Sequence, residues 1–217
     1  MTRHADSPKR PLLALGLICV LSGALLGGVY TLTAEPIAKA RDFHRTEAIA
    51  AVAPPFTNSP ADEAVTITLD GDTRAVTVYP AFDGDSLVGA AVSSWSLDGF
   101  SGEIDVMMGF NADGSVRGFS VMSQKETPGL GARMAEWFAP GAPGDISGIK
   151  PDGAGPTVSK DGGTVDGITA ATISSRAFLQ AVRRAAVAYG RYRAELTGEP
   201  SDAPDHQAVT GASKRNH

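Results

Sequence analysis

Residues 166–189 read DGITAATISSRAFLQAVRRAAVAY, a turn dense in Thr and Ser that leads directly into a helical pattern. From a predicted helix start near Ser174, the apolar residues that share one face at helical spacing are Phe178, Val182, Ala185, Ala186 and Tyr189. The arginines at positions 183, 184, 191 and 193 lie mostly off this stripe. Because an amphipathic helix must bury its apolar stripe against another layer, the rest of the chain is expected to supply one.

The region upstream has the alternating pattern of antiparallel strands. A first hairpin is expected from residues 65–69 and 76–79, with a turn at 70–72 and an end at Pro80. A second group covers residues 86–93, 104–110 and 116–122, with a tight turn at 111–114. One helix against one such sheet is a two-layer α+β domain, and this is the predicted fold class.

An uncharged stretch at residues 11–33 has the length that a membrane-spanning helix needs, roughly 20 residues. It is longer than the apolar core of an ordinary signal peptide and no good A-x-A cleavage site follows it, so we expect an uncleaved anchor. Three basic residues precede the span within the first ten positions, and Glu35 follows it. This bias favours a cytoplasmic N-terminus and places the rest of the chain on the outer face of the membrane.

These patterns divide the chain into five parts. We expect a cytoplasmic N-terminus at 1–10, a transmembrane helix at 11–33 and a globular domain at 61–197. Between the last two lies a juxtamembrane helix and linker at 34–60, in which residues 38–52 have helical composition and a Pro-Pro pair follows. The segment 198–217 has few large apolar residues and is predicted to be a disordered tail.

Charge and composition exclude several classes of function. A net charge of -5 and an isoelectric point near 5.3 argue against nucleic-acid binding, which needs a positive surface. The single cysteine, Cys19, lies in the apolar run, and the four histidines lie near the chain ends. The globular part therefore offers no ligands for zinc, haem or an iron-sulfur cluster, and no Ser or Cys paired with His. We expect no metal site and no catalytic residue, so any redox chemistry requires an organic cofactor.

The Thr/Ser turn has two possible roles. Thr and Ser are favoured at helix N-termini, where their hydroxyls cap backbone N–H groups, and turn chemistry alone favours this structural role. The same position also suits a bound negative charge, because the first N–H groups of a helix lack partners and the helix dipole is favourable there. The residues by themselves leave both roles open.

A second motif follows the last predicted strand. It reads Lys125-Glu126-Thr127-Pro128-Gly129-Leu130-Gly131. Pro-Gly is a turn signal, and the second glycine allows the backbone to approach a neighbour closely. Taken alone, this stretch is an ordinary loop.

Together the two motifs resemble the FMN-binding domain family, which is found in the G subunit of Rnf electron-transport complexes and in the C subunit of the sodium-pumping NADH:quinone reductase. Residues 166–175 are similar to that family's D-x-x-[ST]-G-A-T-x-[ST]-S motif, and E-T-P-G-L-G is similar to its second motif. The similarity covers roughly residues 87–189. It implies that Thr172 carries one FMN through a phosphoester bond, placed there by a flavin transferase that uses FAD and magnesium.

The resemblance also implies which residues surround the cofactor. On the side of the Thr/Ser turn these are Asp166, Thr169, Ala171, Ser174 and Ser175, together with Thr172 itself. On the side of the second motif they are Glu126, Thr127, Gly129, Leu130 and Gly131. One position departs from the family pattern, because Ala170 stands where the family has Gly, and Ala tolerates a positive φ less well.

The expected function is that of a covalent-FMN electron carrier in a bacterial inner-membrane complex of the Rnf type. The implied partners are other membrane and soluble subunits of that complex, and no independent substrate turnover is expected. The flavin domain would lie on the periplasmic face. Length favours the Rnf protein over its counterpart in the sodium pump, whereas Gln124 favours the reverse. A third alternative is a non-redox, membrane-anchored interaction module that keeps the fold without the flavin.

Overall fold

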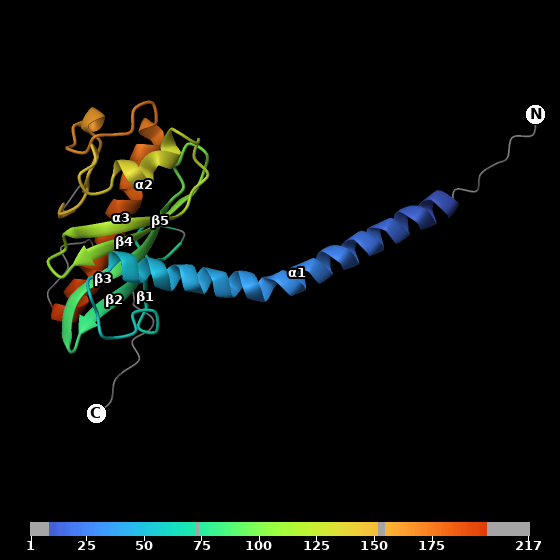
Figure 1. The fold of residues 1–217 in the computed structure, drawn as a ribbon, viewed down its shortest axis with the longest axis horizontal. Coiled ribbons are helices and arrows are strands. Elements are labelled where there is room, and N and C mark those ends of the chain that lie inside the picture. The colour runs from blue at the N-terminus through green and yellow to red at the C-terminus, as the bar shows by residue number, and fades with distance from the viewer. Residues whose placement is uncertain (1–8, 73, 152–154, 199–217) are drawn as a thin grey trace, which may run out of the picture. The chain divides into compact units, whose positions relative to one another are not determined.

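The computed structural model describes residues 9–72, 74–151 and 155–198, and the chain divides into two compact units between Arg45 and Thr46 (Figure 1). Helix α1 (Lys9–Val52) makes up the described part of the first unit and continues into the second. It contains a stretch that is long and apolar enough to cross a membrane, with none of that stretch buried. A span was predicted here. The helix does not give way to a separate one at 38–52, because Pro36 removes only one N–H from it and the helix continues.

The second unit is built on one antiparallel sheet. Its strands are β1 (Val65–Ile67), β2 (Val76–Asp83), β3 (Ser86–Ser96), β4 (Ile104–Asn111) and β5 (Val116–Ser123). Each strand pairs with the next one in the chain, so the spatial order is β1-β2-β3-β4-β5. The predicted α+β class with an antiparallel sheet is therefore confirmed.

The strand β2 extends past the point where the sequence predicted its end. Pro80 lies inside β2 and pairs with Ala90 of β3, but β1 is so short that it pairs only with residues 76–78. Residues 79–83 thus have a strand neighbour on one side only, where a missing N–H is tolerated. On the open side, the Asn58 side chain donates to the Pro80 carbonyl at 3.0 Å and accepts from the Phe82 N–H at 2.9 Å.

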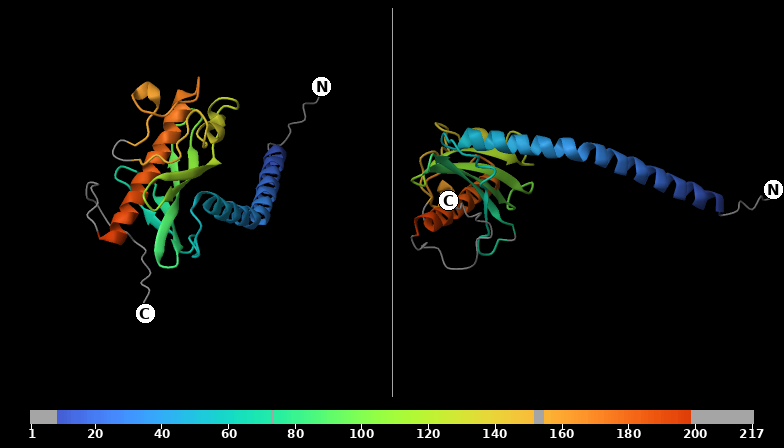
Figure 2. Two further views of the ribbon diagram at one scale, coloured as in Figure 1. Left: turned by 60° about the vertical axis from the view of Figure 1, so that its left-hand side comes forward. Right: turned by 90° about the horizontal axis from the view of Figure 1, so that it is seen from below.

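The main core lies between the sheet and helix α3 (Thr172–Thr197), which crosses one face of the sheet in both views of Figure 2. The predicted stripe is the face that packs: Phe178, Val182, Ala185 and Tyr189 are at most 1% exposed. Phe178 stacks on Phe138 with ring centroids 4.5 Å apart, and Phe110 stacks on Tyr189 at 5.3 Å. The sheet and α3 together therefore hold the Thr/Ser turn at the start of α3 in a fixed place.

A second core covers the other face of the sheet. The end of α1 contributes Ala48, Ile49 and Val52, which pack on residues of β2, β3 and β4. The helix can come this close because β4 has Gly109 at the contact, where a Cβ would lie 2.0 Å from the Val52 carbonyl oxygen. The prediction of one helix on one sheet omitted this packing, since the 38–52 pattern gave no sign of what it would cover.

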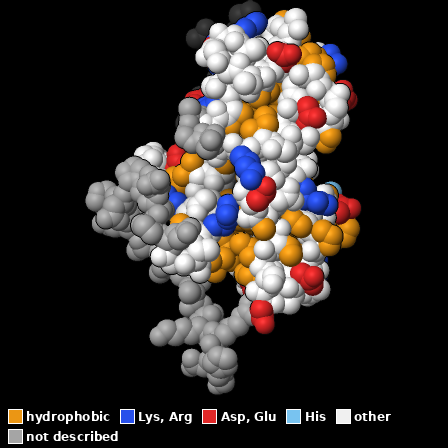
Figure 3. Space-filling view, turned by 90° about the vertical axis from the view of Figure 1, so that its left-hand side faces the viewer, with side chains coloured by type: hydrophobic (Ala, Val, Ile, Leu, Met, Phe, Trp, Pro, Cys, Tyr) orange, Lys and Arg blue, Asp and Glu red, His pale blue; other side chains and the backbone are white. Residues whose placement is uncertain are grey.

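The arginines that lie off the stripe of α3 are mostly engaged within the domain. Arg184 forms a bidentate pair with Asp72 and lies 4.1 Å from the centroid of the Trp95 ring, and both partners of the pair are largely buried. Arg191 pairs with Asp70 at 2.9 Å. Basic and acidic side chains are interspersed on the face shown in Figure 3. These arginines tie α3 to the β1–β2 turn.

The remaining described elements are short. A 3₁₀ turn η1 (Gly131–Arg133) and helix α2 (Met134–Trp137) follow the second motif, and a further 3₁₀ turn η2 (Ser159–Asp161) precedes the Thr/Ser turn. Helix α3 ends at Gly198, whose φ of 68° is typical of a helix C-terminus. The predicted tail lies beyond this point, outside the described residues.

Substituting Gly109 with Ala tests the contact between α1 and the sheet. Because the added Cβ overlaps the backbone of Val52, Gly109→Ala is expected to lower the free energy of unfolding by about 1–3 kcal/mol. Chemical denaturation of the full chain in detergent, followed by near-UV circular dichroism, measures the change. Gly118→Ala is the matched control, since Gly118 pairs directly with Gly109 and has open space beside it. Equal losses in both variants would contradict the close contact.

Candidate functional site

The two sequence motifs meet at the start of α3 and line one pocket. Its cavity volume is about 300 Å³, which lies at the lower end of the range for small-molecule sites. The lining residues are Phe100, Glu126, Thr127, Leu130, Gly131, Ala170, Ala171, Thr172, Ile173 and Ser174. At the rim, Phe100, Leu130 and Ile173 are 67%, 39% and 48% exposed. Exposed apolar side chains gathered around a pocket mark a ligand-binding groove or an interface.

Thr172 is the first residue of α3, and its hydroxyl does not cap the helix. The N-cap residue is Ala171, which makes no side-chain capping hydrogen bond, and the first helical bond runs from the Ser175 N–H to the Ala171 carbonyl. Within the described part of the chain, the N–H groups of residues 172–174 donate to no acceptor. The helix therefore begins with free donors beside a half-buried hydroxyl, a favourable place for an anion.

The turn before Thr172 is held from inside by Ser175. This side chain is fully buried, and its hydroxyl accepts a hydrogen bond from the Ile168 N–H at 2.9 Å and donates to the Ala171 carbonyl at 3.0 Å. Ser175 thus takes the role in turn geometry that a Thr/Ser-rich helix start usually has. The Thr172 hydroxyl makes none of the hydrogen bonds that hold the turn and is therefore available to bind or carry a ligand.

Glu126 joins the two motifs below the pocket. It is 4% exposed, and its Oε2 accepts a hydrogen bond from Ser174 Oγ at 2.7 Å while its Oε1 accepts one from the Ser101 N–H at 3.0 Å. None of the ion pairs in the described part of the chain includes Glu126. The pocket floor therefore carries an acidic group that is satisfied by hydrogen bonds and has no cation beside it.

Gly131 allows the second motif to approach α3. A Cβ at this position would lie 2.3 Å from Ser174 Oγ and 2.8 Å from Glu126 Oε2, so any larger residue would break the contact between the motifs. Gly129 has a φ of 76° and turns the loop toward the helix. Gly131 is thus needed for close packing on α3, and Gly129 for the positive φ of the turn.

The side chain of Lys160 reaches the Thr172 hydroxyl. Lys160 comes from η2, and its Nζ donates to Thr172 Oγ1 at 3.3 Å. Thr172 makes no other side-chain hydrogen bond with the described residues. Neither sequence motif indicated this contact, because Lys160 lies outside both of them and twelve positions before Thr172.

Ala170 adopts a left-handed backbone conformation that glycine would adopt more easily. Its φ is 62°, and it is the only residue other than glycine with a positive φ in the described chain. A left-handed conformation costs an L-residue roughly 1–2 kcal/mol. The turn therefore carries strain at this position instead of relaxing to a different shape.

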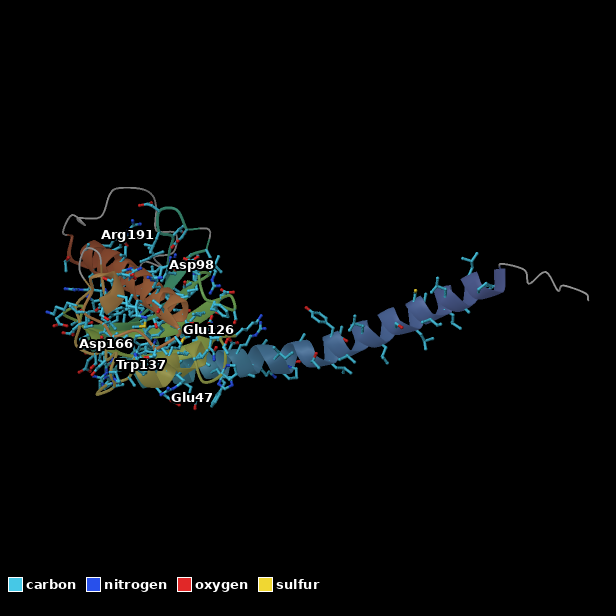
Figure 4. All side chains as sticks on the ribbon, turned by 90° about the horizontal axis from the view of Figure 1, so that it is seen from above. Glu47, Asp98, Glu126, Trp137, Asp166 and Arg191 are labelled. Carbon is cyan, nitrogen blue, oxygen red and sulfur yellow. The ribbon has the colours of Figure 1, made fainter. Side chains whose placement is uncertain are left out.

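The structure brings most, but not all, of the predicted site residues to the pocket. Those that line it are Thr172, Ala171, Ser174, Glu126, Thr127, Leu130 and Gly131. Four others lie outside the lining: Asp166, Thr169, Gly129 and Ser175. Asp166 is exposed, and its backbone carbonyl accepts a hydrogen bond from Trp137 Nε1 at 2.8 Å, so the two residues lie side by side (Figure 4). Thr169 is also exposed.

Phe100, Ala170 and Ile173 line the pocket although they were not among the predicted site residues. The sequence analysis did not single out Phe100, because its exposure at the rim is seen only in the folded chain. The described residues contain no cluster of His, Cys, Asp and Glu that could hold a metal ion. The site thus presents hydroxyl groups, free N–H groups, one acid, one lysine and an apolar rim.

Comparison with known proteins identifies relatives of the chain. Residues 99–187 match the FMN-binding domain family, a range that includes both motifs and every residue of the pocket. The chain is 34% identical to the G subunit of the ion-translocating oxidoreductase complex of Cereibacter sphaeroides, over 88% of each chain. It is 32% identical to the protein of that name from Pseudomonas aeruginosa, over 93% of this chain and 97% of the relative. The protein of that name from Escherichia coli is 39% identical over 58% of this chain and 61% of its own.

Substituting Ala170 with Gly relieves the strain in the turn. Because glycine adopts φ near 60° at little cost, Ala170→Gly is expected to raise the free energy of unfolding by about 0.5–1 kcal/mol. Ala171→Gly is the control, since Ala171 has an ordinary φ of -132° and glycine there is expected to lower stability. Thermal unfolding of both variants measures the difference. A loss of stability in both would show that Ala170 is not strained.

Proposed function

This chain belongs to the family of G subunits of ion-translocating oxidoreductase complexes, and on that basis we propose that it is the FMN-carrying, electron-transferring subunit of a membrane-bound complex of the Rnf type. The share of each relative that is aligned, 88% and 97%, supports a role for the whole chain and not only for its flavin domain. FMN supplies a ring that accepts and releases electrons, so the protein need only hold the cofactor and adjust its environment.

The residues of the pocket fit this cofactor. The donors at residues 172–174 and the ammonium of Lys160 suit a phosphate group, and the apolar rim suits an aromatic ring. Glycine at position 131 lets the two motifs pack against each other beside the pocket, where a Cβ would overlap Ser174 Oγ. The pocket thus has a polar end at Thr172 and a mostly apolar remainder.

We propose further that Thr172 carries the FMN covalently. The observation that supports this is that its hydroxyl holds no part of the turn and lies beside the free N–H groups at the start of α3 and the ammonium of Lys160. Ser175 makes the hydrogen bonds that hold the turn, so the Thr172 hydroxyl can be converted into a phosphoester without loss of the turn. Thr172 has no base among its hydrogen-bond partners, and a separate flavin transferase would perform the reaction.

The candidate membrane span supports a proposal for where the domain works. The helix α1 contains the one candidate span of the described chain. The basic residues before it favour a cytoplasmic N-terminus, and with that orientation the flavin domain would lie on the periplasmic face. A covalent bond suits that side of the membrane, because a dissociated FMN would be diluted there.

Two other functions considered from the sequence receive less support. The relatives named above are all G subunits of ion-translocating oxidoreductase complexes, which favours the Rnf type over the sodium pump. Ala170 was the reason to consider a module that had lost its flavin. Since Ala170 keeps the left-handed turn, that reason falls away.

Thr172→Ala tests the attachment site. Full chain produced together with a flavin transferase is expected to give a fluorescent band on a denaturing gel and one FMN-sized mass increment. Both signals disappear in Thr172→Ala, while the stability of the domain changes by no more than about 1 kcal/mol. Thr164→Ala, an exposed threonine outside the pocket, keeps both signals. A fluorescent band or an FMN-sized mass increment on Thr172→Ala protein would refute the assignment.

Glu126→Gln tests the acidic floor of the pocket. A glutamine can keep both hydrogen bonds, because its oxygen accepts from the Ser101 N–H and its amide donates to Ser174 Oγ. Loss of a negative charge makes addition of an electron nearby easier, so the midpoint potential is expected to rise. The rise is on the order of 30 mV, which equals about 1.4 kcal/mol for two electrons.

A spectroelectrochemical titration of the loaded protein measures that potential. Glu136→Gln is the control, since the side chain of Glu136 is 81% exposed on α2 and lies outside the pocket. An unchanged or lower potential in Glu126→Gln would mean that no charge on Glu126 acts on the cofactor.

A further inference from the structure

We propose that Lys160 is a positioning residue of the attachment site: its ammonium holds the phosphate group at Thr172 and accelerates the modification of Thr172. The proposal rests on the proposed function, since it assumes that Thr172 is the acceptor. It begins from the 3.3 Å hydrogen bond between Lys160 Nζ and Thr172 Oγ1.

The turn that carries Lys160 is clamped to the same helix that carries Thr172. Next to it, Asp161 accepts two hydrogen bonds from Arg176, at 2.6 and 2.7 Å, and Arg176 lies one helical turn after Thr172. This contact lowers the pKa of the Asp161 carboxyl, so the pair stays charged in the neutral range. Lys160 is therefore fixed near Thr172 by its neighbour and not only by its own flexible side chain.

The backbone around η2 supports this placement. Val158 and Val165 form a parallel bridge, and the Ser159 N–H donates to the Val165 carbonyl at 2.8 Å. Gly163 packs against Thr157 so closely that a Cβ would lie 2.1 Å from the Thr157 carbonyl oxygen. The segment 157–165 is thus a closed loop that presents Lys160 toward the start of α3.

The charge of Lys160 is not used elsewhere in the described chain. Asp161, the adjacent acid, is neutralised by Arg176, and Lys160 takes part in no ion pair with the described residues. Lys150 differs, since it pairs with Asp113 at 2.8 Å. An ammonium without an acidic partner, held at a hydroxyl, suits a phosphate group that arrives on that hydroxyl.

The reaction makes clear where this charge acts. Thr172 Oγ forms a bond to the phosphorus of the FMN half of FAD, and the P–O bond of the pyrophosphate breaks. AMP leaves with the bonding electrons, and the proton of the Thr172 hydroxyl passes to a base of the transferase. Negative charge builds up on Oγ and on the phosphate oxygens beside Lys160 Nζ, where a positive charge stabilises it. After the reaction the same ammonium faces a phosphodiester.

The test compares Lys160→Gln and Lys160→Arg in the full chain, in detergent, with a purified flavin transferase, FAD and magnesium. Intact mass followed over time gives the rate of modification. Lys160→Gln is expected to be about five- to tenfold slower, and Lys160→Arg to stay within about twofold of the natural chain, because it keeps the charge. Added salt is expected to slow the natural chain more than Lys160→Gln. Lys150→Gln is the matched control and is expected to react at the natural rate.

A second readout does not depend on the rate of the transferase reaction, because it is taken on chain that is already modified. The ³¹P resonance of the attached phosphodiester is expected to move in Lys160→Gln toward its position in the unfolded chain, while Lys160→Arg moves it less. Equal rates and an unmoved resonance in Lys160→Gln, or equal losses in Lys160→Arg and Lys160→Gln, would overturn the proposal. A natural chain that stays unmodified would instead refute attachment at Thr172, so the two failures are distinct.

Discussion

The buried hydrogen bond between Ser174 Oγ and Glu126 Oε2 is the contact on which the site depends. It joins two segments 48 residues apart, one after the last strand and the other at the start of α3. Gly131 must be a glycine for the bond to form, because a Cβ would occupy the position of the hydroxyl. Loss of this bond would remove the hydrogen bond that joins the second motif to the start of α3.

The rest of the domain keeps these two segments in register. The stripe of α3 packs on one face of the sheet, and the end of α1 packs on the other. The pairs of Arg184 with Asp72 and of Arg191 with Asp70 connect α3 to the β1–β2 turn. The site then has a basic and an acidic side chain at separate places: Lys160 contacts the Thr172 hydroxyl, and Glu126 lines the pocket. The positive charge of Lys160 suits attachment of a phosphate, and the acidic Glu126 suits control of the potential of an electron carrier.

The strands, the buried face of α3 and most of the pocket could be predicted from the sequence, because each depends on a local pattern of residues. Alternation of apolar residues indicated the strands, helical spacing indicated the buried face of α3, and the two motifs indicated most of the pocket. Pro80 was misleading because its effect depends on whether a strand lies beside it, which sequence spacing does not show. The packing of α1 on the sheet and the contact of Lys160 with Thr172 were missed for a related reason. Both contacts join residues that are distant in sequence. The first needs Gly109 opposite Val52, and the second needs the Arg176–Asp161 pair that holds the turn of Lys160 in place.

The central claim is that the structure serves to present one hydroxyl, that of Thr172, to a flavin phosphate. Tryptic cleavage after Lys160 and Arg176 gives the peptide DGGTVDGITAATISSR (161–176), which contains five hydroxyl side chains. Tandem mass spectrometry of this peptide, from chain produced with a flavin transferase, locates the modification among them. The account predicts an FMN-sized increment on every fragment that includes Thr172 and on no fragment that excludes it. An increment on Thr164, Thr169, Ser174 or Ser175, or its absence from this peptide, would contradict the account.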